Sequence, residues 1–178
     1  MYPNPTESKI IQNCSTVIFG KGQAIRNILI AYLCKGHILM EDRPGTGKTM
    51  LLRCFSKTIG GHFKRIQFTP DLQPSDLTGI NFYNPKTGDF QLRKGPLFTD
   101  FVLADEINRA TPRTQSALLE AMGEKQISID GETYPLGNDF MVLATQNPLE
   151  SLGTFPLPDA QLDRFFMKLS LGYMGRAD

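Results

Sequence analysis

The sequence predicts an α/β domain in which a mostly parallel sheet of five strands lies between helices. Three observations lead to this prediction. Short apolar runs alternate along the chain with segments of helical periodicity, a glycine-rich turn joins the first apolar run to the next helix, and the third apolar run ends in two acids. Strands that are covered on both faces are apolar throughout, because neither face meets water.

The composition restricts what the chain can be. Its 178 residues suffice for one domain with a single core, and a hydrophobic fraction of 40% with a net charge of +1 excludes intrinsic disorder. A charge so close to zero argues against a dedicated duplex-DNA binder. The three cysteines lack the spacing of a disulfide framework or a zinc site, and no apolar run has the length of a membrane span. We therefore expect reduced thiols and a cytoplasmic protein.

The first half of the chain contains two predicted helices that alternate with two predicted strands. In order along the chain, these elements cover residues 22–33, 37–40, 49–59 and 63–68. The helices show apolar side chains at helical spacing, and the first strand is a short apolar run. Glycines mark the helix ends, Gly36 after the first helix and Gly60 after the second. Residues 1–15 show no such pattern and are predicted as a loose lead-in.

The second half contains three more predicted strands, one long helix and two hairpins. The strands cover residues 101–104, 140–144 and 166–171. The helix lies between the first two of these strands, where Thr111 is placed to cap it and Pro112 suits its first position. Short β-type runs around turn residues predict hairpins at residues 82–92 and 127–134. In the second hairpin, Asp130-Gly131 is a strong signal for a two-residue turn.

A glycine-rich loop connects the first strand to the helix after it. It reads Glu41-Asp42-Arg43-Pro44-Gly45-Thr46-Gly47-Lys48-Thr49. Gly45 and Gly47 let the backbone curl so that several N–H groups point at one anion, and the next helix directs its positive dipole end to the same place. Lys48 can reach the β- and γ-phosphates of a nucleotide, and the Thr49 hydroxyl can bind Mg²⁺. The loop resembles a Walker A motif, although Asp42 stands where that motif has its first glycine.

A second motif ends the third strand. Two acids, Asp105 and Glu106, follow the apolar residues 101–104, which resembles a Walker B motif. At the carboxyl edge of a parallel sheet, Asp105 would lie near the phosphate loop and bind the Mg²⁺ shell. Glu106 would then orient and polarise the attacking water. A kinase does not need an acid beside its Mg²⁺ aspartate, so the pair favours hydrolysis.

Two further residues complete the predicted catalytic set. Asn147 follows the fourth strand and can hydrogen-bond the water or the γ-phosphate, although an Asn-Pro turn is the alternative. Arg164 precedes the last strand, and its guanidinium suits the charge that builds up on a transferring phosphoryl group. In a ring it would act on the nucleotide of the neighbouring subunit. Arg109 and Arg113 are rivals for this role, and an internal ion pair is the structural alternative for Arg164.

Six further sequence segments identify a protein family more specifically than the glycine-rich loop does. They cover residues 67–79, 103–110, 114–122, 130–136, 144–148 and 161–165. Together they resemble the MoxR family of AAA+ ATPases, and the resemblance extends over residues 16–171. It implies a P-loop NTPase core at residues 16–172, in which the hairpin at residues 81–92 is the insert into the second helix of the fold. The hairpin at residues 127–134 would precede the sensor strand.

The resemblance also implies ligands and partners. The implied cofactors are ATP and Mg²⁺, and the residues that similar proteins use for the nucleotide correspond here to Ile18, Phe19, Gly20, Pro44, Gly45, Thr46, Gly47, Lys48, Thr49 and Met50. Similar proteins are homo-oligomers, often hexameric rings, and act as chaperone-like remodellers of client proteins. They continue into a helical lid domain. Because this chain stops at Asp178, we expect a fragment or a truncated form without the lid.

Two other classes of function stay open at this point. A P-loop kinase or a nucleotide-binding regulatory module would share the phosphate loop, but it would not need both the Asp105-Glu106 pair and Asn147. A nucleic-acid motor is the other alternative, since related ATPases with hairpins include helicase-type rings. The basic side chains of the first hairpin lie beside acids, which argues against nucleic acid as the partner.

Overall fold

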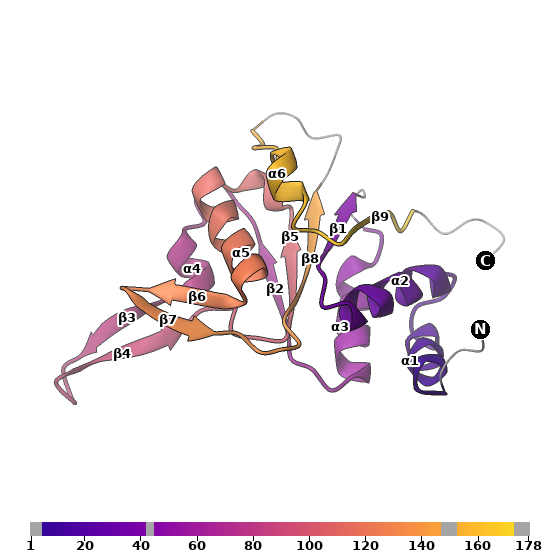
Figure 1. Ribbon diagram of the computed structural model, residues 1–178, viewed down its shortest axis with the longest axis horizontal. Helices are drawn as coiled ribbons and strands as arrows, with labels where there is room; N and C mark the ends of the chain where they lie inside the picture. The colour runs from indigo at the N-terminus through magenta and orange to yellow at the C-terminus, as the bar shows by residue number, and fades with distance from the viewer. Residues whose placement is uncertain (1–4, 42–44, 147–152, 173–178) are drawn as a thin grey trace.

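The computed structural model describes residues 5–41, 45–146 and 153–172. At its centre is a sheet of five strands in the order β2-β5-β8-β1-β9 (Figure 1). Every neighbouring pair is parallel, so the predicted sheet is confirmed and is parallel throughout. Its strands are β1 (Ile38–Glu41), β2 (Phe63–Gln67), β5 (Phe101–Asp105), β8 (Met141–Gln146) and β9 (Met167–Leu169).

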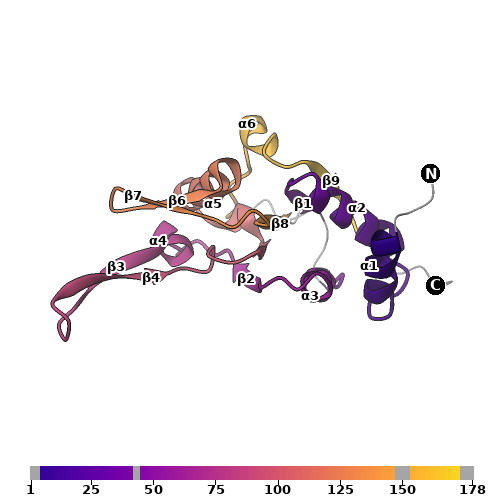
Figure 2. The ribbon, with the colours of Figure 1, turned by 60° about the horizontal axis from the view of Figure 1, so that its bottom comes forward.

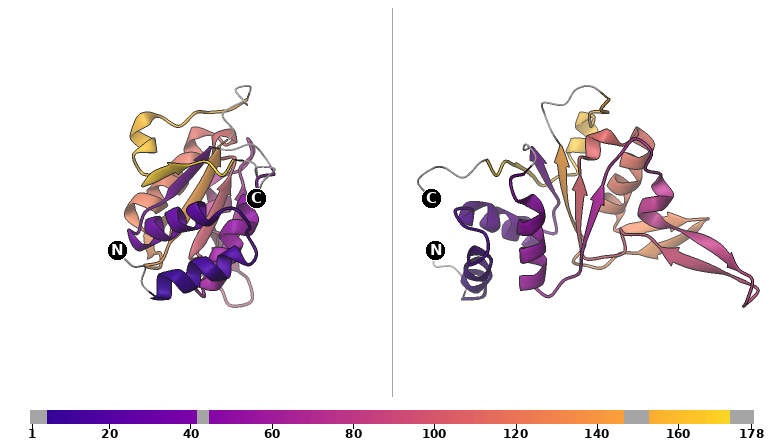
Figure 3. Two further views of the ribbon diagram at one scale, coloured as in Figure 1. Left: turned by 90° about the vertical axis from the view of Figure 1, so that its right-hand side faces the viewer. Right: turned by 180° about the vertical axis from the view of Figure 1, so that it is seen from behind.

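Helices cover the sheet from both sides (Figure 3). One group consists of α1 (Pro5–Ser15), α2 (Gly22–Leu33) and α3 (Lys48–Thr58). The other consists of α4 (Pro74–Thr78), the 3₁₀ turn η1 (Ile107–Arg109), α5 (Pro112–Glu124) and the short α6 (Asp159–Leu162). None of the helices in the described residues has the length and apolar character needed to cross a membrane.

Strand β5 shows why the central strands are apolar runs. Phe101 and Leu103 belong to the core shared with α1, α2 and α3, whereas Val102 and Ala104 belong to the core shared with α4 and α5. All four side chains are buried. Successive side chains of a strand point to opposite faces, so a strand covered on both faces has no position left for a polar residue.

The two predicted hairpins are present and extend beyond the sheet side by side (Figure 2). They consist of β3 (Gly79–Asn84) with β4 (Asp89–Lys94), and of β6 (Gln126–Ile129) with β7 (Glu132–Pro135). Asp130 and Gly131 have φ angles of 52° and 84°, the two positive angles that the predicted turn requires. The Asn81 amide donates to the Asp130 carboxylate at 3.1 Å and links the two hairpins.

The prediction of a loose lead-in over residues 1–15 was wrong for residues 5–15, which form α1. This helix packs on α3, where Cys14 is buried and the Asn13 amide donates to the Thr58 hydroxyl at 2.9 Å. Its apolar side chains are few, Ile10, Ile11 and Cys14, so the periodic signal is too short to detect. Packing against α3 supplies the stability that the local sequence lacks.

Helix ends follow the predictions with two differences. Gly60 takes the left-handed conformation after α3, with φ of 77°. After α2, however, the left-handed residue is Lys35 and not Gly36, whose N–H instead bonds the Ala31 carbonyl at 2.8 Å. Thr111 stands at the N-cap of α5 without making a side-chain cap, because its hydroxyl lies 3.3 Å from that of Thr114.

His37 connects the sheet to α5 through a buried imidazole. Its Nδ1 accepts the backbone N–H of Val142 at 3.0 Å, and its Nε2 donates to the Met122 carbonyl at 3.1 Å. Only the neutral ring can accept at one nitrogen and donate at the other. Burial lowers the pKa of His37 from 6.5 to about 4, and the charge of Lys125 acts in the same direction.

Stability should therefore fall with acid. An unfolded histidine takes up a proton near pH 6.5, while folded His37 does so only near pH 4, so protons favour the unfolded state between these values. We expect the free energy of unfolding to fall by roughly 3 kcal/mol across this interval from His37 alone. Urea denaturation at a series of pH values measures the effect.

The acid dependence above pH 4.5 should disappear in His37→Gln and persist in His62→Gln. His62 is the matched control, because its side chain is largely exposed. The carboxyl groups with lowered pKa values, Glu41, Asp71 and Asp139, start from ordinary values of 4.5, 3.8 and 3.8, so they act at lower pH. An unchanged pH slope in His37→Gln would contradict the assignment.

Candidate functional site

The predicted site residues meet at the carboxyl edge of the sheet. Parallel strands all end on the same side, and the register places Glu41 of β1 beside Gln146 of β8. On the other side of β8, Gln67 of β2 lies beside Asp105 of β5. Residues from four segments of the chain are thereby brought together.

The phosphate loop leads from β1 to the first residue of α3, Lys48. Gly45 and Gly47 have φ angles of 85° and 84°, in the left-handed region that favours glycine. Gly47 is the N-cap of α3, so the N–H groups in the first turn of the helix face the loop. Asp42 and Pro44 lie outside the described residues, and the prediction for Pro44 stays a prediction.

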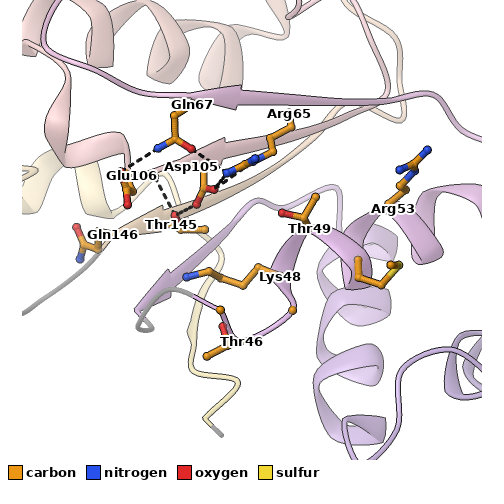
Figure 4. A pocket seen from close by; sticks show the side chains of 13 residues that line it. Thr46, Lys48, Thr49, Arg53, Arg65, Gln67, Asp105, Glu106, Thr145 and Gln146 are labelled. Atoms are coloured by element: carbon orange, nitrogen blue, oxygen red, sulfur yellow. Dashed lines mark hydrogen bonds and ion pairs between the residues drawn. The ribbon is translucent and has the colours of Figure 1, made fainter.

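A cavity of about 460 Å³ lies between this loop and the strand ends (Figure 4). Its lining contains three basic and two acidic side chains: Lys48, Arg53, Arg65, Asp105 and Glu106. The other lining residues are Gly45, Thr46, Gly47, Thr49, Met50, Gln67, Thr145 and Gln146. The structure therefore brings the predicted Walker A and Walker B residues to one cavity.

A second cavity of about 450 Å³ adjoins the first. Both are lined by the loop residues Gly45, Thr46 and Gly47 and by Met50. The second also has apolar walls, to which Ile18, Phe19 and Leu171 contribute. Ile18 and Phe19 line this cavity and Gly20 does not, and the role of all three in binding the base stays a prediction.

The Asp105 carboxylate is bonded at both oxygens. Its Oδ1 accepts the Thr145 hydroxyl at 2.6 Å. Its Oδ2 accepts the Arg65 guanidinium twice, from Nη2 at 2.6 Å and from Nε at 3.2 Å. These bonds give the carboxylate a fixed orientation at the cavity wall.

Glu106 is held by its backbone and by its side chain. Its backbone is left-handed, with φ of 58°, and its N–H donates to the Thr145 hydroxyl at 2.9 Å. The Oε2 atom accepts the Gln67 amide at 2.8 Å and lies 3.3 Å from Nε of Arg109. Residues in this backbone region are strained unless their surroundings hold them, and such residues are concentrated at functional sites.

The strand ends on the other side of the cavity form a smaller polar group. Glu41 accepts hydrogen bonds from Lys168 on β9, at 2.9 Å, and from Gln146 on β8. The Lys168 ammonium, helped by the Gln146 amide, holds the pKa of the Glu41 carboxyl below its ordinary value. Glu41 therefore stays charged where the phosphate loop begins.

The three candidate arginines are not among the residues that line this cavity. Arg164 donates from Nη1 to the Leu119 carbonyl of α5 at 3.1 Å. Arg113 lines a separate cavity between α4 and the hairpins, and Arg109 faces Glu106 of its own chain. Asn147 lies outside the described residues, so its role stays a prediction.

The donor set fits a magnesium-bound polyphosphate. Lys48, the start of α3 and two further basic side chains of the cavity favour anionic oxygens. Among the described residues, no cluster of three or more His, Cys, Asp or Glu side chains could hold a metal by itself. Mg²⁺ typically takes one or two protein ligands and completes its shell with phosphate oxygens and water. Thr49 and Asp105 both line the cavity and could supply those protein ligands.

Sequence reasoning missed five residues that line this cavity: Arg53, Arg65, Gln67, Thr145 and Gln146. The contacts of Arg65, Gln67 and Thr145 run between strands that lie far apart in the sequence. The segments at residues 67–79 and 144–148 contain Gln67 and Thr145, but neither segment assigns a role to them. One signal was available. Arg65 and Gln67 stand two residues apart at the end of a predicted strand, which places both on the same face.

The chain is similar to known proteins over most of its length. Residues 37–167 match the family described as "ATPase family associated with various cellular activities (AAA)". The chain is 55% identical over 170 residues to the uncharacterized protein YeaC of Bacillus subtilis, covering 96% of this chain and 53% of YeaC. It is 46% identical over 168 residues to the chaperone MoxR1 of Mycobacterium tuberculosis, covering 94% of this chain and 45% of MoxR1.

A solved structure from Cytophaga hutchinsonii, of a protein assigned as an ATPase, is similar in fold and sequence. The two share 49% identity and superpose with a TM-score of 0.88, covering 97% of this chain and 52% of the other. This chain therefore spans about half the length of the relatives that it matches.

Thr145→Val should destabilise the protein by about 1–3 kcal/mol, because the part-buried N–H of Glu106 and one oxygen of Asp105 lose their partner. Thr145→Ser keeps the hydroxyl and should lose less. Chemical denaturation of both variants measures the difference. A loss in Thr145→Val no larger than the loss in Thr145→Ser would contradict the role of the hydroxyl.

Proposed function

The chain belongs to the AAA family of ATPases, in its MoxR branch, and on this premise we propose that the two joined cavities bind ATP with Mg²⁺ and hydrolyse it. One observation carries the proposal. Lys48 and Thr49 at the start of α3 line the same cavity as Asp105 and Glu106 at the end of β5. A site for polyphosphate hydrolysis needs this combination of anion-binding groups, a carboxylate for the metal and a second carboxylate for the water.

The phosphate-binding role falls to the loop and to α3. Lys48 extends across the cavity toward the strand ends in Figure 4, where it would meet the β- and γ-phosphates. The backbone N–H groups around Gly45 and Gly47 would bind the same oxygens. Thr49 and Asp105 would hold Mg²⁺, which neutralises the charge that develops on the phosphates.

Glu106 is the proposed general base. Its position directly after Asp105 places a second carboxylate at the cavity wall, where it would orient and polarise the attacking water. In this structure Gln67 and Arg109 bond the carboxylate, so Glu106 must exchange at least one of these partners for water. Asn147 would complete the water site from the end of β8.

The second cavity would receive the adenine. Ile18 and Phe19 supply apolar surface beside the loop, and Met50 borders both cavities. One ligand could therefore place a planar base in the second cavity and its phosphates in the first. Discrimination among bases would rest on backbone groups of residues 17–19. Gly20 would contribute to the shape of this segment through its left-handed backbone.

We propose that the ATPase acts in a homo-oligomer, a hexameric ring by analogy with similar proteins, and that it remodels a client protein. The support is the similarity to a protein named chaperone MoxR1 and the placement of Arg164 outside its own cavity. An arginine that does not serve its own site is free in principle to serve that of a neighbouring subunit. The residues of the core would be 16–172.

Glu106→Gln should keep ATP binding within about threefold and reduce turnover by about a hundredfold or more, the usual effect of losing a general base. Equilibrium binding of a fluorescent ATP analogue and release of phosphate measure the two quantities. Glu124→Gln, on the exposed end of α5, is the matched control and should behave like the unchanged chain. Unchanged hydrolysis in Glu106→Gln would remove Glu106 from the mechanism.

Arg164→Ala should lower turnover per subunit by about tenfold or more, and mixing it with Lys48→Ala protein should restore part of the activity. In the mixture, the Lys48→Ala subunit supplies Arg164, and the Arg164→Ala subunit supplies a nucleotide site with Lys48. Thermal unfolding of Arg164→Ala tests the alternative, since its bond to Leu119 also joins two elements. Lost stability with no recovery on mixing would make Arg164 a structural residue.

A further inference from the structure

Two cysteines lie close together between α1 and α3. Cys14 belongs to α1 and Cys54 to α3, and the two helices lie side by side (Figure 3). Thr58 follows Cys54 by one helical turn, so both residues occupy the same face of α3. The Thr58 hydroxyl accepts a hydrogen bond from the Cys14 thiol at 3.5 Å and donates to the Cys54 carbonyl at 3.0 Å. Cys14 therefore meets the face of α3 that carries Cys54, within hydrogen-bond reach of its thiol.

The two thiols differ in how far a reagent can reach them. Cys14 is fully buried, whereas Cys54 is half-buried and lines a third cavity of about 440 Å³. Burial also raises the pKa of the Cys14 thiol. Thiol–disulfide exchange begins with a thiolate that the disulfide reagent can reach, and a neighbouring thiol then attacks the mixed disulfide. Cys54 is accessible for the first step, and Cys14 lies beside it for the second.

The third cavity carries positive charge. Its lining contains Arg53 and Lys57, and none of the described residues that line it is acidic. The remaining lining residues are Asn13, Thr16, Val17, Met50 and Thr58. Two cations beside an accessible thiol favour a reagent that bears carboxylates as well as a disulfide bond. A cavity of this volume has room for a small molecule and not for a folded protein.

We propose that Cys54 and Cys14 form a thiol–disulfide exchange site for an anionic low-molecular-weight disulfide. The Cys54 thiolate attacks one sulfur of the reagent, the S–S bond of the reagent breaks, and one small thiolate leaves. Cys14 then loses its proton and attacks the Cys54 sulfur, and the second small thiolate leaves. The two protein thiols are oxidised to one disulfide bond, and the reagent is reduced to two thiols, which take up the two protons that the cysteines released.

The new bond would also act on the second cavity, which residues 17–19 line beside α1. The Cys14 carbonyl accepts the N–H of Val17 at 3.1 Å and the N–H of Ile18 at 2.9 Å. A covalent bond holds two sulfur atoms closer than a hydrogen bond does, so closure draws the end of α1 toward α3. Val17 and Ile18 move with it. This consequence rests on the function proposed above, because these residues belong to the proposed base site.

The first test measures intact mass after incubation with oxidised glutathione, a disulfide that bears carboxylates. Cys34 is exposed and would react by itself, so Cys34→Ser is the background for every variant. The chain with both remaining cysteines should lose two hydrogen atoms and keep no glutathione. Adding Cys14→Ser should stop the reaction at a glutathione adduct, and adding Cys54→Ser should prevent it. A lasting adduct in the chain with both cysteines, a disulfide-linked pair of chains, or no reaction under conditions that modify Cys34 of the unchanged chain would overturn the proposal.

The second test addresses the charge of the reagent. Lys57→Gln should slow the reaction with oxidised glutathione by about threefold, the size of one exposed charge interaction, and should not slow the reaction with the cationic disulfide cystamine. Lys57 is suited to this test because it lines the third cavity and not the first, whereas Arg53 lines both. Lys64→Gln, on β2 outside this lining, is the matched control and should leave both rates unchanged. Equal effects of Lys57→Gln on the two reagents would overturn the selectivity for anions.

The third test compares equilibrium binding of a fluorescent ATP analogue by the oxidised and reduced forms. Oxidation should weaken binding by about fivefold, about 1 kcal/mol, and a reductant should restore it. Cys54→Ser treated in the same way is the control, because it should stay unmodified. Equal affinities of the two forms would overturn the effect on the second cavity. A reduced chain that does not bind the analogue would overturn the proposed function and this effect together, whereas the mass measurement decides the exchange site without any nucleotide.

Discussion

Parallel alignment of β1, β5 and β8 is the constraint on which the rest of the structure depends. Parallel neighbours cannot be joined by a tight turn, so the chain must cross a face of the sheet between them, and the crossing helices cover both faces. The same alignment brings every strand end to one edge. The buried part of each strand must be apolar. The polar residues that follow these strands therefore meet at this edge of the sheet.

Charge at this edge is balanced residue by residue. Asp105 and Glu106 are adjacent carboxylates that would repel each other in a partly buried cavity, and each has an arginine of its own, Arg65 for the first and Arg109 for the second. The Thr145 hydroxyl accepts the backbone N–H of Glu106 and donates to the Asp105 carboxylate. These two bonds help to hold the two acidic side chains apart. The left-handed backbone of Glu106 contributes to the same separation, because it turns the second side chain away from the strand axis.

The two adjoining cavities differ in character, and this difference determines what can bind. One is lined by charges of both signs, and the other has apolar walls around Ile18 and Phe19. The phosphate loop borders both, so a ligand with a charged end and a planar apolar end would contact the loop along its length. Helix α1, which precedes residues 16–19, packs on α3 and supports this wall from the outside.

The sequence by itself determined the alternation of strands and helices, the phosphate loop and the two acids. Apolar periodicity is a local property, and Lys48, Thr49, Asp105 and Glu106 stand in contiguous motifs whose chemistry depends on neighbours in the chain. Only the tertiary structure decided which groups bond to the acids. Arg65 and Thr145 each lie 40 residues from Asp105 and reach it across the sheet. Helix α1 and the contact of Arg164 with Leu119 were decided in the same way, because packing between distant segments leaves no pattern in either segment alone.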